Sequence, residues 1–152
     1  MERTIVAVVD DTEESRLAVD FAARRAAREG GRVLLVHVLP PPDFVQWGAV
    51  AQAMEEEARA EGEAVLAAVA DRVEAMTGAR PATELRVGPT GQQVLDVVTD
   101  TPGVVALVLA TAATGAAGPL VSFFTAERLA GLPCPLVLVP GGLAPRDIAA
   151  LA

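Results

Sequence analysis

Five short apolar runs, separated by stretches with helical periodicity, constrain this sequence more than any other feature. The runs lie at residues 4–9, 32–39, 82–87, 104–110 and 135–140. Short runs rich in Val and Ile are typical of parallel strands that are buried on both faces of a sheet. The helical patterns lie at residues 13–29, 50–76, 89–100 and 122–130. This alternation predicts a doubly wound α/β fold, with a five-stranded parallel sheet and helices on both faces.

The length of 152 residues fits one domain. We expect the α/β domain to occupy residues 1–140. Residues 141–152 read as a tail broken by Gly and Pro, with a short helix from Pro145. No apolar run reaches the length of a membrane span, and the N-terminus lacks the pattern of a signal peptide. With Cys134 as the single cysteine, no internal disulfide can form, so the sequence predicts a cytoplasmic protein.

The charge balance argues against several classes of partner. The formal net charge is −8, all twelve basic residues are Arg, and they form no basic run. A strongly acidic chain repels nucleic acid and anionic lipid, so we expect neither as a partner. The absence of Lys from the sequence excludes a phosphate-loop lysine and a Schiff base.

Local signals define the first helix and part of the core. Asp11 or Thr12 can cap the helix that follows the first strand, and Glu14 lies at a capping-box distance from Asp11. Gly30 with Gly31 can end the helix. Hydrophobic positions in the predicted strands and helices give the expected core. We expect almost complete burial of Val6, Val8, Phe21, Leu35, Leu107 and Leu109.

Few residues suggest chemistry. Asp10 ends the first strand, at the carboxyl edge where open α/β sheets bind ligands. His37 lies inside an apolar strand, which favours a histidine satisfied by the backbone over a catalytic one. Cys134 fits a small buried hydrophobe, and Trp47 fits either a loop anchor or a partner contact. Without paired acid–base groups, a nucleophile motif or metal-ligand spacing, we expect no catalytic residues, no metal site and no enzyme activity.

Three stretches carry a family resemblance. They are IVAVVDDTEESRLAVDFA near the N-terminus, VLLVHVL in the second strand and AERLAGLPCPLVLVP before the tail. Together they resemble the universal stress protein family over residues 3–140, and Gly88–Pro89 resembles the family's opening of the third helix. The resemblance implies the strand order 3-2-1-4-5. It also implies a homodimer in which the last strand pairs with its twin through Leu136, Val137, Leu138 and Val139. We expect Ile148 and Leu151 of the tail to cover the margin of this interface.

The resemblance also points to a degenerate nucleotide site. Nucleotide-binding members carry Gly-x2-Gly-x9-Gly-Ser/Thr between the fourth strand and the fourth helix. Aligned on residues 127–128 and 133–135, those four positions hold Ala110, Ala113, Phe123 and Phe124. A shifted match offers Gly115 and Gly118, but residues 128 and 129 then stand where the second pair should be. Asp10 matches the family's aspartate at the first strand tip, and Val38 matches the backbone position that faces adenine.

We therefore expect a remnant cleft rather than a working nucleotide site. Its expected residues are Asp10, Val38, Ala110, Gly115, Gly118 and Phe124. An aromatic ring at the helix start would occupy the space of a phosphate, so Phe123 or Phe124 either turns into that region or packs beneath it. Alanine in place of glycine costs about 1 kcal/mol where the backbone must adopt positive φ.

Two functions remain open from the sequence. The first is a dimeric regulatory or protective protein of the universal stress type, with no cofactor, no tight ATP binding and an unidentified protein partner. The alternative is an adenine-nucleotide binder that holds ATP or AMP weakly through a shifted Gly115/Gly118 loop, with slow hydrolysis. A metabolic enzyme on the same fold is disfavoured because Lys is missing and no acid–base pair is evident.

Overall fold

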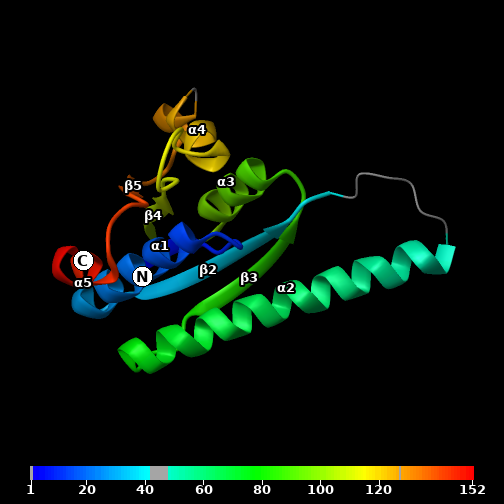
Figure 1. The fold of residues 1–152 in the computed structure, drawn as a ribbon, viewed down its shortest axis with the longest axis horizontal. Coiled ribbons are helices and arrows are strands. Elements are labelled where there is room, and N and C mark those ends of the chain that lie inside the picture. Colours follow the sequence, from blue (N-terminus) through cyan, green and yellow to red (C-terminus); the bar gives the residue numbers. More distant parts are fainter. Residues whose placement is uncertain (1, 42–47, 127) are drawn as a thin grey trace.

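A computed structural model describes residues 2–41, 48–126 and 128–152. Five parallel strands form one sheet in the order β3-β2-β1-β4-β5, which confirms the predicted fold and order (Figure 1). The strands are β1 (Thr4–Val8), β2 (Arg32–Leu39), β3 (Ala82–Val87), β4 (Val104–Ala110) and β5 (Leu136–Val139). Trp47 and Glu127, which entered the sequence interpretation, lie outside the described residues.

The helices cover both faces of the sheet. Alternate side chains of β1 point to opposite sides, as the pleat of a strand requires. Ile5 and Ala7 belong to a core shared with α1 (Glu13–Glu29), α2 (Gly48–Thr77) and α5 (Pro145–Leu151). Val6 and Val8 belong to a second core shared with α3 (Thr90–Asp100) and α4 (Pro119–Thr125). The sheet is therefore the middle layer of three.

The boundaries of α1 follow from its cap residues. Thr12 is the N-cap, because its side-chain oxygen accepts a hydrogen bond from the backbone amide of Ser15 at 3.3 Å. Asp11, the other candidate, does not serve as the cap. Gly30 ends the helix with φ of 71°, and its amide donates to the Ala26 carbonyl. This left-handed conformation suits glycine, because a side chain would be strained there.

The predicted core is correct except at Phe21. Val6, Val8, Leu35, Leu107 and Leu109 are at most 5% exposed. Phe21 is only half-buried, because it lies at the margin of α1 beneath the guanidinium of Arg25, whose central carbon is 5.0 Å from the ring centroid. The aromatic ring thus packs partly against the core and partly against a cation.

Helix α2 packs on the sheet only through its second half. Gly62, Leu66, Ala70 and Val73 are buried, whereas residues 48–61 are exposed except for the half-buried Ala51. Figure 1 shows this first half running beyond the edge of the sheet. Helical periodicity over residues 50–76 predicted the helix correctly but gave no sign that half of it leaves the domain surface.

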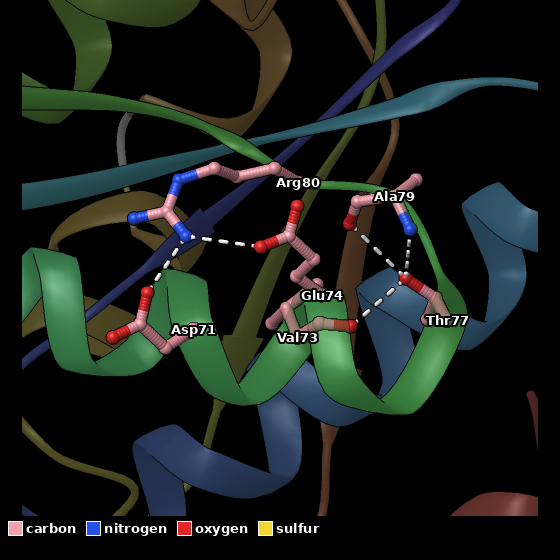
Figure 2. Close-up of polar contacts among 6 residues, drawn as sticks. All are labelled: Asp71, Val73, Glu74, Thr77, Ala79 and Arg80. Atoms are coloured by element: carbon pink, nitrogen blue, oxygen red, sulfur yellow. Dashed lines mark hydrogen bonds and ion pairs between the residues drawn. The ribbon is translucent and has the colours of Figure 1, made fainter.

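Polar contacts fix the turn that joins α2 to β3 (Figure 2). The Thr77 hydroxyl donates to the Val73 carbonyl at 2.9 Å and accepts from the Ala79 amide at 3.3 Å. Arg80 forms ion pairs with Asp71 at 2.7 Å and Glu74 at 3.3 Å. The hydrogen bond and charge of Asp71, with Glu74, raise the pKa of Arg80. Gly78, with φ of 80°, follows the last residue of the helix, and these contacts hold the turn that leads into the edge strand β3.

The fourth helix differs from its predicted range of 122–130. It spans Pro119–Thr125, and a separate 3₁₀ turn covers Leu129–Gly131. Pro119 occupies the first helical turn, where its fixed φ and missing N–H are tolerated, so the helix begins at this proline. Phe123 and Phe124 consequently lie in the last part of the helix rather than at its start.

The C-terminal residues pack against the first helix. Ile148 of α5 is fully buried in the core that α1 shares, and Arg25 donates to the Leu151 carbonyl at 3.3 Å. Arg28 donates to the carbonyl of Ala152. The sequence placed Ile148 at the margin of a dimer interface, but its side chain is part of the core of its own chain. Among the described residues, no helix is both long and apolar enough to cross a bilayer.

Candidate functional site

A cleft lies where the strand order reverses, between the carboxyl ends of β1 and β4. Neighbouring parallel strands whose connections run to opposite sides leave such a crevice in doubly wound sheets. The cleft has a volume of about 210 Å³. One wall comes from the segment that joins β1 to α1, and the other comes from the segment that joins β4 to α4.

Three of the six predicted site residues line this cleft. Asp10, Ala110 and Gly118 are among its walls. Val38, Gly115 and Phe124 are not. The structure therefore brings together one carboxylate, one alanine and one glycine of the predicted set.

Asp10 organises the turn before α1. Its carboxylate Oδ1 accepts hydrogen bonds from the Thr12 amide at 2.8 Å and from the Thr12 hydroxyl. Its backbone carbonyl accepts a hydrogen bond from the Ser15 hydroxyl at 3.3 Å. An Asp that bonds the backbone two residues ahead is a common turn device. Part of the Asp10 carboxylate is thus committed to shaping the cleft.

Glu14 places a second carboxylate in the cleft. It lies in the first turn of α1 and is half-buried, and it lines the cleft together with Asp10 and Ser15. The Thr12 side chain and the backbone amides of Glu14 and Ala113 hold the pKa of the Glu14 carboxyl below its ordinary value of 4.5. Hydrogen bonds to the ionised form favour that form, so Glu14 is negatively charged at neutral pH.

Sequence reasoning missed Glu14 as a residue of the site. Its position three residues after Asp11 suggested a capping role, which the structure assigns to Thr12 alone. The position of Glu14 was itself a signal. The first turn of a helix that follows a strand lies at the same edge of the sheet as the tip of that strand, so a carboxylate there is close to the expected cleft.

The opposite wall is anchored to the end of β5. The Thr111 amide donates to the Val139 carbonyl at 2.9 Å, and the Gly141 amide donates to the Thr111 hydroxyl at 3.0 Å. A Cβ atom on Gly141 would lie 2.9 Å from the Ala112 carbonyl carbon and closer still to the Thr111 carbonyl oxygen. The segment after β4 is therefore held in place by backbone contact with the segment after β5.

The two glycines of the shifted motif differ in position. Both have left-handed φ, 76° at Gly115 and 107° at Gly118, and neither has a neighbouring atom within 4 Å of where a Cβ would lie. Gly118 is the N-cap of α4 and lines the cleft. Gly115 is exposed at the tip of the loop and does not line it. The pair does not form one phosphate-binding surface.

The aromatic pair packs beneath the cleft, which is one of the two predicted outcomes. Phe124 is fully buried in the core shared with α3, so its ring does not occupy ligand space. Phe123 meets it edge-on, with ring centroids 5.0 Å apart at 79°. Phe123 itself lies between Gly91 of α3 and the guanidinium of Arg128, whose central carbon is 4.2 Å from the ring centroid. The expectation that Phe124 belongs to the cleft is therefore wrong.

Val38 and His37 serve the sheet. Val38 is 9% exposed and packs in the core of the α3 face. The His37 Nδ1 atom lies 2.7 Å from the Val9 carbonyl oxygen, so the ring is satisfied by backbone, as the sequence suggested. On the other side of this strand, Gly62 of α2 leaves room for the ring of His37 and for the side chain of Leu85.

The family is decided by comparison with known proteins. The model of the universal stress protein family matches residues 1–140. The chain belongs to this family. A search of curated proteins found no match.

Solved structures of universal stress proteins share the fold. UspA from Lactobacillus plantarum is 20% identical, with a TM-score of 0.71 over 90% of this chain and 97% of its own. A universal stress protein in complex with cAMP is 17% identical, with a TM-score of 0.66 over 92% and 98%. One from Archaeoglobus fulgidus in complex with dAMP is 18% identical, with a TM-score of 0.58 over 91% and 98%. At these identities the likeness concerns the fold.

Proposed function

We propose that this universal stress protein is a cytoplasmic regulatory or protective module that works as a homodimer, without tight ATP binding and without catalysis. The observation that supports weak binding is the composition of the cleft. Within the described part of the chain, its lining contains two carboxylates and no arginine. A polyphosphate bound there would lack a counter-charge, and the sequence has no lysine to provide one.

Titration calorimetry with ATP tests the proposal directly. The expected dissociation constant is no tighter than the high micromolar range, about −4 to −5.5 kcal/mol in binding free energy. We also expect no nucleotide to remain bound through purification. A low-micromolar constant, or electron density for ATP beside Gly118, would contradict the proposal.

A weak adenine-nucleotide binder is the second candidate. It is favoured by the complexes of two structural neighbours with cAMP and dAMP, and by the positive φ of Gly118, which lines the cleft. In this candidate the protein would hold ATP or AMP at the β4–α4 loop and hydrolyse it slowly. Turnover that disappears in a Gly118→Val variant would favour it, since a β-branched residue is strained at this φ.

The proposed dimer rests on the exposed edge of β5. Among the residues that the structure describes, this strand pairs only with β4, and Leu138 is 39% exposed. An uncovered apolar edge strand favours association, and pairing with a twin strand gives a two-fold contact. Leu138→Asp should give a monomer in sedimentation velocity at tens of micromolar (about 50 µM). Val87→Asp, at the exposed opposite edge of the sheet, is the control and should remain dimeric. A monomeric wild type, or a dimeric Leu138→Asp, would contradict the proposal.

A further inference from the structure

The first turn of α1 carries two glutamates that differ in direction. Glu13 and Glu14 are adjacent and both lie near the N-terminus of the same helix. Glu13 is exposed and does not line the cleft, whereas Glu14 is half-buried and does. The two residues therefore have the same charge and nearly the same relation to the helix dipole, but only one faces the ligand space.

Glu14 lies at the N-terminus of α1, where a bound anion would otherwise find hydrogen-bond donors. Helix N-termini and loop amides ordinarily attract phosphate. Here the Ser15 amide is already used by the Thr12 side chain. The backbone of Ala113, in the segment that joins β4 to α4, contributes to the lowered pKa of the Glu14 carboxyl. A carboxylate of the protein itself thus lines the space that a bound phosphate would need.

The remaining groups do not compensate for this charge. Among the described residues of the lining, the other ionisable group is Asp10, which is also a carboxylate, and most of the β4–α4 wall is made of apolar side chains such as Ala110, Ala117 and Leu120. An uncharged ring can be buried against such a wall, since apolar surface is favourable there. A phosphate group would meet two like charges beside this wall, and their repulsion would weaken its binding.

We propose that Glu14 is the specificity-determining residue of the cleft and admits an uncharged nucleoside while it excludes the phosphorylated form. This inference rests on the proposed weak nucleotide binding by the same cleft. It names the preferred ligand class, a heterocycle with an uncharged sugar, and assigns the selection to one side chain.

The test compares adenosine and AMP as probes on wild type, Glu14→Gln and Glu13→Gln. Each Gln variant keeps the size of the side chain and removes one negative charge. Glu13→Gln therefore has the same net charge as Glu14→Gln and nearly the same effect on the helix dipole, which makes it the matched control. Ligand-observed NMR titration measures weak dissociation constants for both probes. Glu14→Gln should bind AMP about fivefold to tenfold more tightly than wild type, as expected for removal of one nearby charge. Adenosine should change by less than about twofold, and Glu13→Gln should leave both constants within about twofold.

A second readout is the dependence on salt. The gain in AMP affinity from Glu14→Gln should shrink as NaCl rises from about 20 mM to about 300 mM, because salt screens the repulsion in wild type. Melting curves of the three proteins should coincide, which shows that the variants are folded.

Several outcomes would overturn the inference. They are an unchanged AMP constant in Glu14→Gln, an equal gain in Glu13→Gln, an equal gain for adenosine, or no AMP binding by any of the three proteins. Tight ATP binding by wild type would instead refute the proposed function. That measurement is separate from the ratio of AMP to adenosine affinity, so the two failures are distinguishable.

Discussion

Replacing Phe124 with alanine tests whether this ring is a core residue or a plug in the cleft. The side chain is fully buried in the core between the sheet, α3 and α4. Truncation to alanine removes about 100 Å² of buried apolar surface, or about 2.5 kcal/mol at the usual coefficient. Loss of the edge-to-face contact with Phe123 adds about 1 kcal/mol. The free energy of unfolding should therefore fall by about 3–5 kcal/mol once the residual cavity is included.

Phe123→Ala is the matched comparison. Its ring is only half-buried and rests against Gly91 and the guanidinium of Arg128. We expect a loss of about 1–2 kcal/mol, from partial burial and the cation–π contact. Urea denaturation followed by far-ultraviolet circular dichroism measures both losses through the midpoint, with an unchanged slope.

The ligand affinity of the same variants separates the two interpretations. A ring that filled the phosphate region would leave space when removed, so AMP would bind more tightly to Phe124→Ala. The structure instead predicts an unchanged AMP constant. Phe124→Leu provides a folded alternative if the alanine variant is too unstable, and its loss should be about 1–1.5 kcal/mol. A loss below about 1 kcal/mol for Phe124→Ala, or a larger loss for Phe123→Ala, would refute the reasoning.

The fold supports four further predictions. Ala70→Pro, in the packed half of α2, should unfold the protein or lower its free energy of unfolding by about 3 kcal/mol or more. Ala53→Pro, in the exposed half, should lower it by less than about 1 kcal/mol in urea denaturation. Similar losses for the two variants would contradict the exposure of that half. Gly141→Ala should lower the free energy of unfolding by about 2 kcal/mol, because the new Cβ would press on the loop after β4. Gly142→Ala should be nearly neutral by the same assay, because its Cβ would lie 3.8 Å from the nearest neighbouring atom. Burial raises the pKa of the Cys134 thiol above its ordinary value of 9.0. Iodoacetamide should therefore react more slowly with the folded protein than with the urea-unfolded protein at pH 9.0, because the thiolate is the reactive form. Equal rates would contradict this prediction. A thiol whose pKa is raised by folding stabilises the native state below its unfolded pKa, so the free energy of unfolding should fall as the pH rises above 9.0, less so in Cys134→Ser.

Local pattern determined the elements of this protein. The apolar runs placed five strands, and Gly30 and Pro145 marked a helix end and a helix start that the structure confirms. These signals succeed because strand burial, left-handed φ and proline geometry depend on a few adjacent residues. The family resemblance supplied the strand order, which is confirmed. It also supplied the six residues of the expected remnant cleft, and three of them do not line the cleft that the structure shows.

Tertiary structure decided which side chains meet in the cleft. Phe124 left the predicted site because α4 begins at Pro119, which sets the rotation of the helix and turns this ring into the core. Glu14 entered the cleft because the first turn of α1 faces a loop that lies about a hundred residues later in the chain. The sequence by itself determined where the strands and helices lie, which residues can end the helices, and the net charge of the protein. Which face of each helix opposes which loop depends on packing between distant segments, and no local pattern records that.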